Sequence, residues 1–312
     1  MTFKISRRWL ALAGMAVGLV TAIWWVALDS RAPASAPAVI DLKALRAALN
    51  TDAADTFPTA VRMHKVGSGE APMLAVETGG GLGKFRIAYT AFEIVYPDGH
   101  IMIDAAVDRE TAQSIASKDS LQFSDAAYEQ LLQRMAGARM VLLTHEHKDH
   151  VMALARHPAL PALIAKAWLP SAQGPALSSF ARTASDRTIM QRAANKSLTH
   201  AQRLAPGIAV APLSGHSPGS LLTLVRLKNG REYLFIGDVA WSFSNVLNLR
   251  TRPRFLQWIM FDPDEERDDI LMQLRALHDI RRANPDLIIV PSHDAVYLER
   301  LEQGDILEDA RN

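Results

Sequence analysis

The sequence predicts a four-layer αββα sandwich, an α/β fold with two sheets inside and helices outside, formed by one domain over residues 39–312. Three observations support this fold class. β-like runs, a helix and a strand occur in that order twice along the chain. Hydrophobic residues make up 49% of the 312 positions, which is enough for a large core. No segment of roughly 20 to 50 residues is repeated, which argues against a solenoid or a propeller.

Residues 1–38 predict an export signal or a membrane anchor with a Pro/Ala-rich linker. Three basic residues precede a stretch without charge at residues 9–28, and these 20 positions are enough to span a bilayer as a helix. The basic flank places the rest of the chain outside the cytoplasm, in the periplasm. Ala32-Pro33-Ala34 offers a cleavage site, so the protein is expected to be soluble after cleavage or anchored to the inner membrane. Residues 6–10 also resemble a twin-arginine signal, although the n-region of an ordinary leader explains the same arginines.

Charge and cysteine content restrict the partners and the chemistry. The first 34 positions hold four basic residues and one acidic residue, so the formal charge of +1 for the whole chain leaves −2 for the body. No basic stripe indicates nucleic acid, and the expected partner is a small-molecule substrate. The chain has no cysteine, so a metal ion would be held by nitrogen and oxygen alone. The sequence leaves the oligomeric state open.

The first half of the domain predicts a helix, a β-meander and a second helix. Residues 39–50 have apolar positions at helical spacing behind Asp41, a suitable N-cap. Residues 79–84 are glycine-rich but lack the spacing of a phosphate loop, so a flexible connection is expected there. Pro97-Asp98-Gly99 forms a turn between two alternating segments. Residues 124–137 combine a serine N-cap, helical periodicity and a glycine stop.

The second half repeats this order. Residues 208–241 form a β-rich block with a hairpin turn at Asn229-Gly230. Residues 262–286 predict an amphipathic helix, with acidic residues in its first turn and arginines in its last. Residues 287–294 then predict a buried strand that ends in Ser292-His293-Asp294. The two halves therefore supply two sets of strands and helices for the sandwich.

Three of the ten histidines lie in the short sequence Thr-His-Glu-His-Lys-Asp-His, directly after an apolar run. His145 and His147 are two positions apart at the end of the expected strand, so their side chains should leave the same face. Asp149 and His150 follow where the chain must turn, and they should point in different directions. One metal ion can take the first two residues, and a second ion can take the other two.

Each ion then needs one more protein ligand. Imidazole and carboxylate without thiolate suit zinc, and a catalytic zinc with three protein ligands keeps a position open for water. His216, Asp238 and His293 each follow a strand-like run and are flanked by Gly, Ser or Pro. Loops at one sheet edge could bring these three residues to the first cluster.

These motifs together resemble the metallo-β-lactamase superfamily of binuclear metallohydrolases. The resemblance rests on HxHxDH, a GH[ST]PG loop, a GD after an apolar strand and a late SH, in this order over about residues 63–294. It implies two zinc ions per chain and a metal-bridging hydroxide. It also implies the following ligands: His145, His147 and His216 for the first ion, Asp149, His150 and His293 for the second, and Asp238 between them. The remaining histidines match no motif and are expected at the surface or in satisfied positions: His64, His100, His157, His200 and His278.

The expected activity is hydrolysis of an ester or amide carbonyl by zinc-bound hydroxide, with a lactone or a related acyl ester as the leading substrate. Asp149 is also a candidate catalytic residue that orients the nucleophile or carries a proton to the leaving group. Ser220 stands where glyoxalase II-like members often have a second histidine, and Trp241 stands where lactonases commonly have a tyrosine. β-Lactam hydrolysis of the subclass B3 type remains an alternative, as does an iron-dependent oxidoreductase of the persulfide dioxygenase type.

An aromatic-rich stretch between Asp238 and His293 is a candidate acyl pocket. Its alternative is packing of the outer helix on the sheet. The substrate-binding candidates within it are Trp241, Phe243 and Trp258, and the neighbouring apolar residues are Phe255, Met260 and Phe261.

Overall fold

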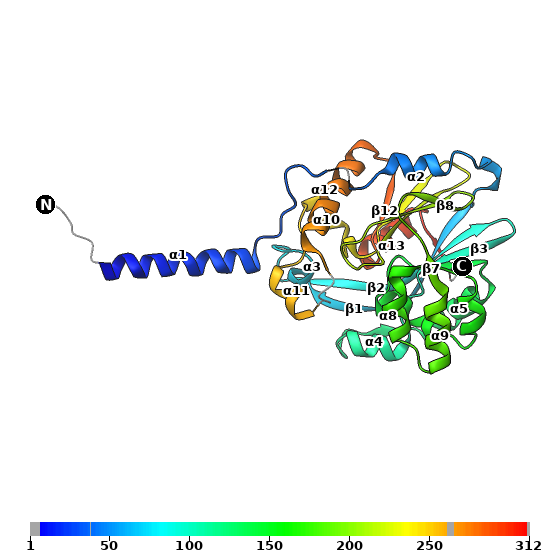
Figure 1. Ribbon diagram of the computed structural model, residues 1–312, viewed down its shortest axis with the longest axis horizontal. Helices are drawn as coiled ribbons and strands as arrows, with labels where there is room; N and C mark the ends of the chain where they lie inside the picture. The colour runs from blue at the N-terminus through cyan, green and yellow to red at the C-terminus, as the bar shows by residue number, and fades with distance from the viewer. Residues whose placement is uncertain (1–6, 38, 261–264, 311–312) are drawn as a thin grey trace.

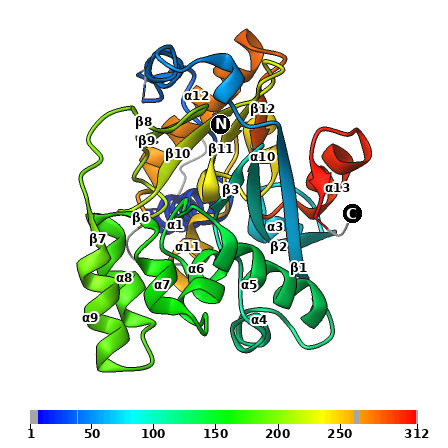
Figure 2. The same cartoon turned by 90° about the vertical axis from the view of Figure 1, so that its right-hand side faces the viewer.

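The protein has two β-sheets packed face to face, with helices covering both outer faces (Figures 1 and 2). The computed structural model describes residues 7–37, 39–260 and 265–310. In Figure 2, helices α4 to α9 lie on one side of the sheets and helices α2 and α12 lie on the other. This arrangement is the predicted αββα sandwich.

The larger sheet is mixed, with strand order β13-β1-β2-β3-β5-β6-β7 and β4 paired to β1. A long hairpin of β1 and β2 forms one half, and β3, β5, β6 and β7 run parallel to one another in the other half. The Pro97-Asp98-Gly99 turn joins β2 to β3 as predicted. The strands are β1 (Ala60–Pro72), β2 (Lys84–Tyr96), β3 (Gly99–Ile103), β4 (Gln122–Phe123), β5 (Met140–Leu142), β6 (Ala167–Pro170), β7 (Ala194–Lys196) and β13 (Glu308–Asp309).

The smaller sheet has the order β12-β11-β10-β9-β8. Asn229-Gly230 makes the hairpin turn between β10 and β11, and β12 joins β11 in parallel. The strands are β8 (Gln202–Ala205), β9 (Ile208–Pro212), β10 (Leu221–Arg226), β11 (Glu232–Phe235) and β12 (Ile288–Val290).

Helices cover the outer face of each sheet. Two of the helices that the sequence predicted, α5 and α2, begin at their predicted N-caps. Ser124 caps the start of α5, and Asp41 accepts a hydrogen bond from the backbone of Ala44 at 2.8 Å at the start of α2. The helices over the larger sheet are α4 (Arg109–Ile115), α5 (Asp125–Gly137), α6 (Lys148–Ala155), α7 (Leu160–Ile164), α8 (Gly174–Ser179) and α9 (Ala184–Ala193). Those over the smaller sheet are α2 (Leu42–Ala48), α10 (Phe243–Asn248) and α12 (Arg267–Ala283).

Apart from α1, the remaining elements of the described residues are three short α-helices and three single-turn 3-10 helices. The helix predicted over residues 262–286 begins at Arg267 in the structure, and residues 261–264 lie outside the described part. The remaining elements are α3 (Met73–Val76), α11 (Arg254–Met260), α13 (Ala295–Gln303), η1 (Ala54–Thr56), η2 (Ser171–Gln173) and η3 (Gly237–Val239).

The apolar core has three parts, one for each interface between layers. Between the two sheets, the rings of Phe92 and Phe235 meet edge to face with centroids 5.0 Å apart. Leu131 and Met135 of α5 pack against the outer face of the larger sheet. Leu274 of α12 packs against the outer face of the smaller sheet, with Leu45 of α2 in the same cluster. Burial of this apolar surface is what holds the four layers together.

Parallel strand pairs determine where the polar loops meet. The pairs β3–β5 and β11–β12 are both parallel, so their C-terminal ends lie at the same edge of each sheet. Ligands commonly bind outside the carboxyl ends of parallel strands. In this chain the loops that follow β5, β9, β11 and β12 carry the residues of the candidate site.

Helix α1 (Arg7–Ala27) extends away from the domain (Figure 1). It has 21 residues with a mean hydropathy of 2.0 in its most apolar window, and none of them is buried. Its length and composition are therefore sufficient to cross a membrane, a property that signal sequences share.

Candidate metal centre

The loop after β5 carries the first four candidate residues. Strand β5 ends at Leu142 and helix α6 begins at Lys148, so His145 and His147 lie in the connecting loop. The expectation that these two histidines end a strand is wrong, because the strand stops earlier. Asp149 and His150 lie in the first turn of α6.

Glu146, which lies between His145 and His147, forms hydrogen bonds to the loop that carries His216. Glu146 is buried and accepts hydrogen bonds from the Ser217 hydroxyl and the Gly219 amide, both at 2.9 Å. A side chain at position 219 would collide with the Glu146 carboxylate, so a glycine is needed there. This contact holds the loop that carries His216 against the loop that carries His145.

The structure brings all seven predicted residues together in two groups. In each group the possible ligand atoms lie within 4.8 Å of one another. One group consists of His145, His147 and His216, and the other consists of Asp149, His150, Asp238 and His293. Their members are the residues that the resemblance implied as ligands, with Asp238, expected between the two ions, grouped here with Asp149, His150 and His293.

Asp238 lies between the two groups and directs one oxygen toward each. Its Oδ2 is 3.8 Å from His145 Nε2 and 3.6 Å from His216 Nε2. Its Oδ1 is 3.3 Å from His150 Nε2 and 3.2 Å from His293 Nε2. A carboxylate in this position can bind two cations at once.

The residues at this centre fit a metal ion. His145 Nε2 and Asp238 Oδ1 are buried and have no hydrogen-bond partner. The Nε2 atoms of His150 and His293 are only 3.1 Å apart, and His147 Nδ1 is 2.9 Å from His216 Nε2. Pairs of ring nitrogens at such distances, beside an orphaned carboxylate oxygen, are what two cations would require. Unpartnered buried polar atoms are costly, so this convergence calls for a bound group.

Hydrogen bonds to the other ring nitrogens set the orientation of the histidines. His293 Nδ1 donates to the Ala88 carbonyl at 2.9 Å. His150 Nδ1 donates to Asp104 at 2.9 Å, and His216 Nδ1 donates to Glu265 at 3.1 Å. Such partners fix the tautomer and make the ring a better ligand. Each Nε2 therefore faces the centre.

Asp104 and Glu265, together with Arg252, are the functional residues that sequence reasoning missed. Asp104 follows β3 with a φ of 61° and accepts hydrogen bonds from both the amide and the hydroxyl of Thr144. Glu265 pairs with Arg252 at 3.1 Å, and both side chains are buried. A lone acidic residue directly after a strand was the signal available for Asp104; nothing local to Glu265 distinguished it.

The electrostatic environment differs between the two groups. Burial, with the neighbouring His150 next in size, lowers the pKa of His145 well below its ordinary value. Burial and His216 lower the pKa of His147 to about 4. Both rings are therefore neutral and have a lone pair available for a cation.

Carboxylates dominate the second group. Burial favours the neutral form of His293, but Asp238 and Asp149 outweigh it and raise the pKa to about 10. His150 is shifted in the same direction, because Asp104 and Asp238 outweigh its burial and raise its pKa. Burial opposes ionisation of Asp149, yet His293 and His150 hold its pKa below the ordinary value. The carboxylates of this second group therefore favour a positive charge among them, whether it is carried by protons on the histidines or by a metal cation.

The three substrate-binding candidates have different surroundings. The indole N–H of Trp241 donates to Asp238 Oδ2 at 2.8 Å, so it is directed at the centre and not at open space. Phe243 stacks on Tyr297 with ring centroids 4.3 Å apart and belongs to the packing of α10, which favours the packing alternative. The side chain of Trp258 lies outside the described residues, as does Phe261.

The other histidines lie outside both groups. His64 contacts Glu93 at 3.0 Å, and His100 and His157 contact the carbonyls of Arg134 and Leu132. His200 and His278 are at or near the surface beside Thr199 and Asp279.

Solved structures with the same architecture identify the fold. A quorum-quenching N-acyl homoserine lactone lactonase matches 80% of this chain and 96% of its own, with a TM-score of 0.58 and 14% identity. An N-acyl homoserine lactone hydrolase with N-hexanoyl-L-homoserine at its catalytic metal centre matches 82% and 99%, at 0.58 and 13%. A dizinc quorum-quenching lactonase matches 75% and 86%, at 0.51 and 13%. The chain has the metallo-β-lactamase fold.

The evidence for this fold is structural. No protein-family model and no curated protein matches the chain in sequence. At 12–14% identity the shared property is the metallo-β-lactamase fold itself. The roles of the residues in those loops are argued from the geometry above.

Proposed function

We propose that the chain is a metal-dependent hydrolase that holds two zinc ions and cleaves an acyl ester, with a lactone as the leading substrate. The observation that carries the proposal is the position of Asp238, whose two oxygens face two separate groups of histidines. A metallo-β-lactamase fold and similarity to proteins described as lactonases support it.

The proposed ligands follow the two groups. His145, His147 and His216 would hold the first ion, and Asp149, His150 and His293 the second, with Asp238 shared. Imidazole and carboxylate donors in a chain without cysteine favour zinc over softer metals. Two bound zinc ions would lower the pKa of a shared water to roughly 7 and polarise the carbonyl under attack.

Asp149 is the proposed catalytic residue among the protein groups. Its Oδ2 lies 3.1 Å from His293 Nε2, and its side chain keeps 20% of its surface exposed, unlike the 1% of His293. The carboxylate thus reaches both the metal group and the open side of the centre. From there it can orient the nucleophile and carry a proton to the leaving oxygen.

The surroundings of Ser220 and Trp241 refine the choice of substrate. The Ser220 hydroxyl bonds with the amide and the hydroxyl of Ser217 within its own loop and supplies no imidazole, so a glyoxalase II-like ligand set is not supported. Trp241 supplies an N–H at the position where lactonases commonly have a tyrosine, but it donates to Asp238. We therefore propose lactone chemistry with the carbonyl polarised mainly by the metal pair.

The proposed setting is the periplasm, reached through the apolar segment at residues 1–38. The apolar helix α1 and the basic residues before it support export. The proposed partner is a small-molecule substrate, and the hydrolase domain is proposed to include residues 39–312.

Metal analysis with a substrate panel tests the proposal. The full chain should contain about two zinc ions and hydrolyse lactones faster than β-lactams, thioesters or phosphodiesters. His293→Ala should lose metal and activity together, whereas His278→Ala, a partly exposed histidine outside both groups, should retain both. Preferred β-lactam turnover would move the assignment to the β-lactamase alternative. One iron with oxygen uptake would move it to the oxidoreductase alternative.

A further inference from the structure

The segment that follows α1 is built into the domain. Residues 30–32 pair in antiparallel fashion with residues 249–251: Ala32 N donates to Leu249 O at 2.8 Å, and Thr251 N donates to Ser30 O at 3.2 Å. Ser30 is buried. The predicted cleavage site at Ala32-Pro33-Ala34 begins at the last residue of this pairing, so cleavage there would remove a strand-like segment from the fold.

Two arginines that begin helices α11 and α12 bind the same segment. Arg254 ion-pairs with Asp29 at 3.5 Å and lies 4.2 Å over the ring of Trp25, near the end of α1. Arg267 is buried and donates to Asp29 O at 2.7 Å and to Arg252 O at 2.9 Å. These contacts fix where α1 leaves the domain.

The same contacts connect the end of α1 to the candidate ligands. Arg252, which Arg267 holds, pairs with Glu265, and Glu265 accepts from His216. The Arg252 guanidinium also lies 4.8 Å over Trp241, whose N–H donates to Asp238. The exit point of α1 and the metal centre are therefore neighbours.

Exposed apolar side chains gather around this exit point. Leu82 is 98% exposed in the loop after α3, and that loop contacts Arg250, the pairing partner of Arg31. Leu247 is exposed two positions before Leu249, and Ile259 is 75% exposed on α11, the helix that begins at Arg254. Figure 1 shows α3, α10 and α11 at the side of the domain from which α1 emerges.

Helix α1 itself has the dimensions and ends of a membrane span. Its 21 residues would extend about 30 Å as a helix, the thickness of a bilayer core. Exposed tryptophans lie near both ends, Trp9 at one and Trp24 and Trp25 at the other. Such aromatic belts mark the two interfaces of a bilayer, so the domain begins directly at the second interface.

We propose that α1 is a retained membrane anchor and that the face around Leu82, Leu247 and Ile259 rests on the bilayer surface, with the metal centre beside it. The domain boundary then falls at about residue 28, and residues 29–37 belong to the domain. A consequence that rests on the proposed function is the substrate class: an amphiphilic acyl ester whose chain is dissolved in the bilayer.

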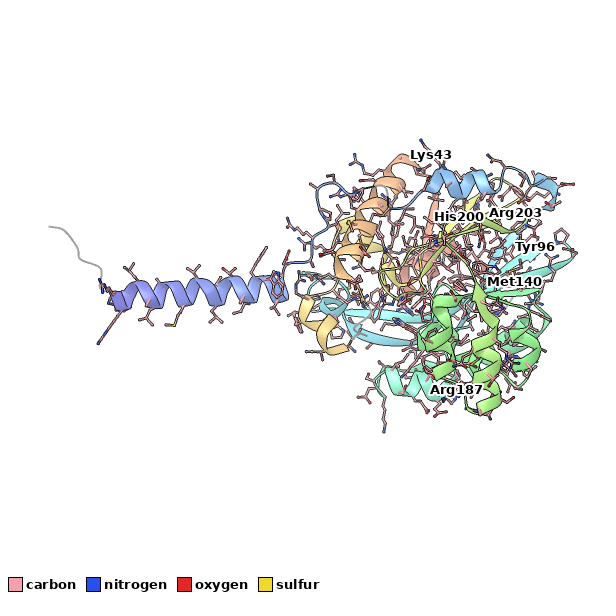
Figure 3. The ribbon with its side chains drawn as sticks, in the orientation of Figure 1. Lys43, Tyr96, Met140, Arg187, His200 and Arg203 are labelled. Carbon is pink, nitrogen blue, oxygen red and sulfur yellow. The ribbon has the colours of Figure 1, made fainter. Side chains whose placement is uncertain are left out.

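Single-cysteine labelling of the full chain tests the bilayer contact, because the sequence has no other cysteine. Leu82→Cys and Leu247→Cys probe the proposed face. Arg203→Cys is the matched control, since Arg203 lies at the end of the domain opposite α1 (Figure 3). Each variant carries a polarity-sensitive fluorophore and is reconstituted in phosphatidylcholine vesicles with and without nitroxide lipids.

The expected result is quenching at positions 82 and 247 that exceeds the quenching at position 203 by at least about twofold, since interfacial side chains enter only the headgroup region. Adding Arg254→Gln to the Leu82→Cys variant should reduce that quenching, because the anchor is then less firmly held. Equal quenching at all three positions would overturn the bilayer contact. A membrane-extracted chain that begins after Ala34 would overturn the retained anchor.

Hydrolysis by the same vesicles separates this inference from the proposed function. A short-chain lactone reports the chemistry alone, and a long-chain lactone reports delivery from the bilayer. Loss of the long-chain preference after Arg254→Gln, with short-chain turnover retained, supports delivery from lipid. An unchanged preference overturns the substrate class. Absence of turnover with both lactones contradicts the proposed function and leaves the fluorescence result to decide the bilayer contact.

Discussion

Two buried clusters in this fold, one around Glu93 and one around Asp238, both combine histidines with a carboxylate. They differ in whether protein side chains satisfy the hydrogen bonds of the carboxylate. In one, Glu93 of β2 is contacted by His64 at 3.0 Å and by Arg134 through both of its oxygens. In the other, Asp238 lies among four histidines, and its Oδ1 has no hydrogen-bond partner. Both carboxylates are almost fully buried.

The comparison shows what distinguishes a structural cluster from a metal centre. At Glu93, the Arg134 guanidinium bonds both oxygens and neutralises the charge, and no further group is required. At Asp238, the neighbours are imidazoles that direct their Nε2 atoms into the same space as the carboxylate. In that space the Nε2 atoms of His150 and His293 lie 3.1 Å apart, so protons on both rings would repel each other, and a metal cation satisfies this cluster better.

Removing the shared carboxylate should have the largest effect. Asp238→Ala deletes the group proposed to touch both ions, so the zinc content should fall from about two to one or less and kcat/KM should fall by at least about 1000-fold. Metal analysis after gel filtration and lactone turnover measure the two effects. Glu93→Ala, the matched deletion in the other cluster, should keep its zinc. Full metal content in Asp238→Ala would contradict the shared-ligand role.

Asp149→Asn tests the catalytic role separately from the shared ligand. The amide keeps the size and one oxygen but cannot take up a proton, so kcat should fall by about 100-fold or more. The unfolding midpoint should change little, because the side chain is partly exposed. Steady-state kinetics, zinc analysis and urea unfolding make this comparison; unchanged turnover, or a loss of zinc that accounts for the lost turnover, would refute the role.

The sequence predicted the seven clustered residues because each lies in a short motif, either within a few positions of the end of a strand or in the first turn of a helix. Apolar runs end where a sheet ends, so the loops that follow share one edge. The partners in the surrounding shell were not predictable in this way. Glu265 meets His216 across 49 positions, and Asp104 meets His150 across 46, through contacts that only the folded chain determines.

The sequence predicted the longer helices and strands of the layers because these segments have a clear hydrophobic periodicity. It did not predict the short elements between His150 and β8. Residues 39–50, 124–137 and 208–241 show clear periodicity, and their elements have the predicted character. Between His150 and β8, the chain forms several helices of five to ten residues and two short strands. Segments of this length carry too few periodic positions to distinguish them from loops.

Glu93→Gln should destabilise the fold without affecting the metal. Burial opposes the ionisation of Glu93, but hydrogen bonds from His64 and Arg134 prevail and hold its pKa at about 2. Relative to the ordinary value of 4.5, this shift corresponds to about 3 kcal/mol of stability at pH 7. Urea unfolding of both proteins in EDTA measures the difference, and wild-type zinc content in the variant is the control.

The difference in unfolding free energy between the wild type and Glu93→Gln should decrease as the pH is lowered. Because the folded-state pKa is depressed, the stabilisation is complete above the ordinary pKa of about 4.5 and is lost as the pH falls toward 2. The gap between the wild type and Glu93→Gln should therefore be constant from pH 7 to 5 and shrink below pH 4.5. A gap that does not depend on pH would assign the effect to packing.

Glu265→Gln should have a smaller effect on the metal than loss of a ligand. The glutamine can still accept from His216 but no longer carries the charge that pairs with Arg252. Loss of such a partner costs about 10- to 100-fold in metal affinity. Competition with a chelator gives the affinity, and Glu70→Gln, an exposed ion-pair variant, controls for charge. Unchanged affinity would show that the ring orientation of His216 is set by other contacts.

The smallest expected effect comes from Trp241→Phe. This change keeps the ring beneath Arg252 and removes the N–H that donates to Asp238 Oδ2. One hydrogen bond to a carboxylate that we propose is shared by two cations should contribute about 1 kcal/mol, so kcat/KM should fall about fivefold while the zinc content stays near two. Trp241→Tyr offers a hydroxyl in its place. Recovery with tyrosine but not with phenylalanine would show that a donor at this position serves the reaction itself, whereas equal losses would limit Trp241 to the packing of Arg252.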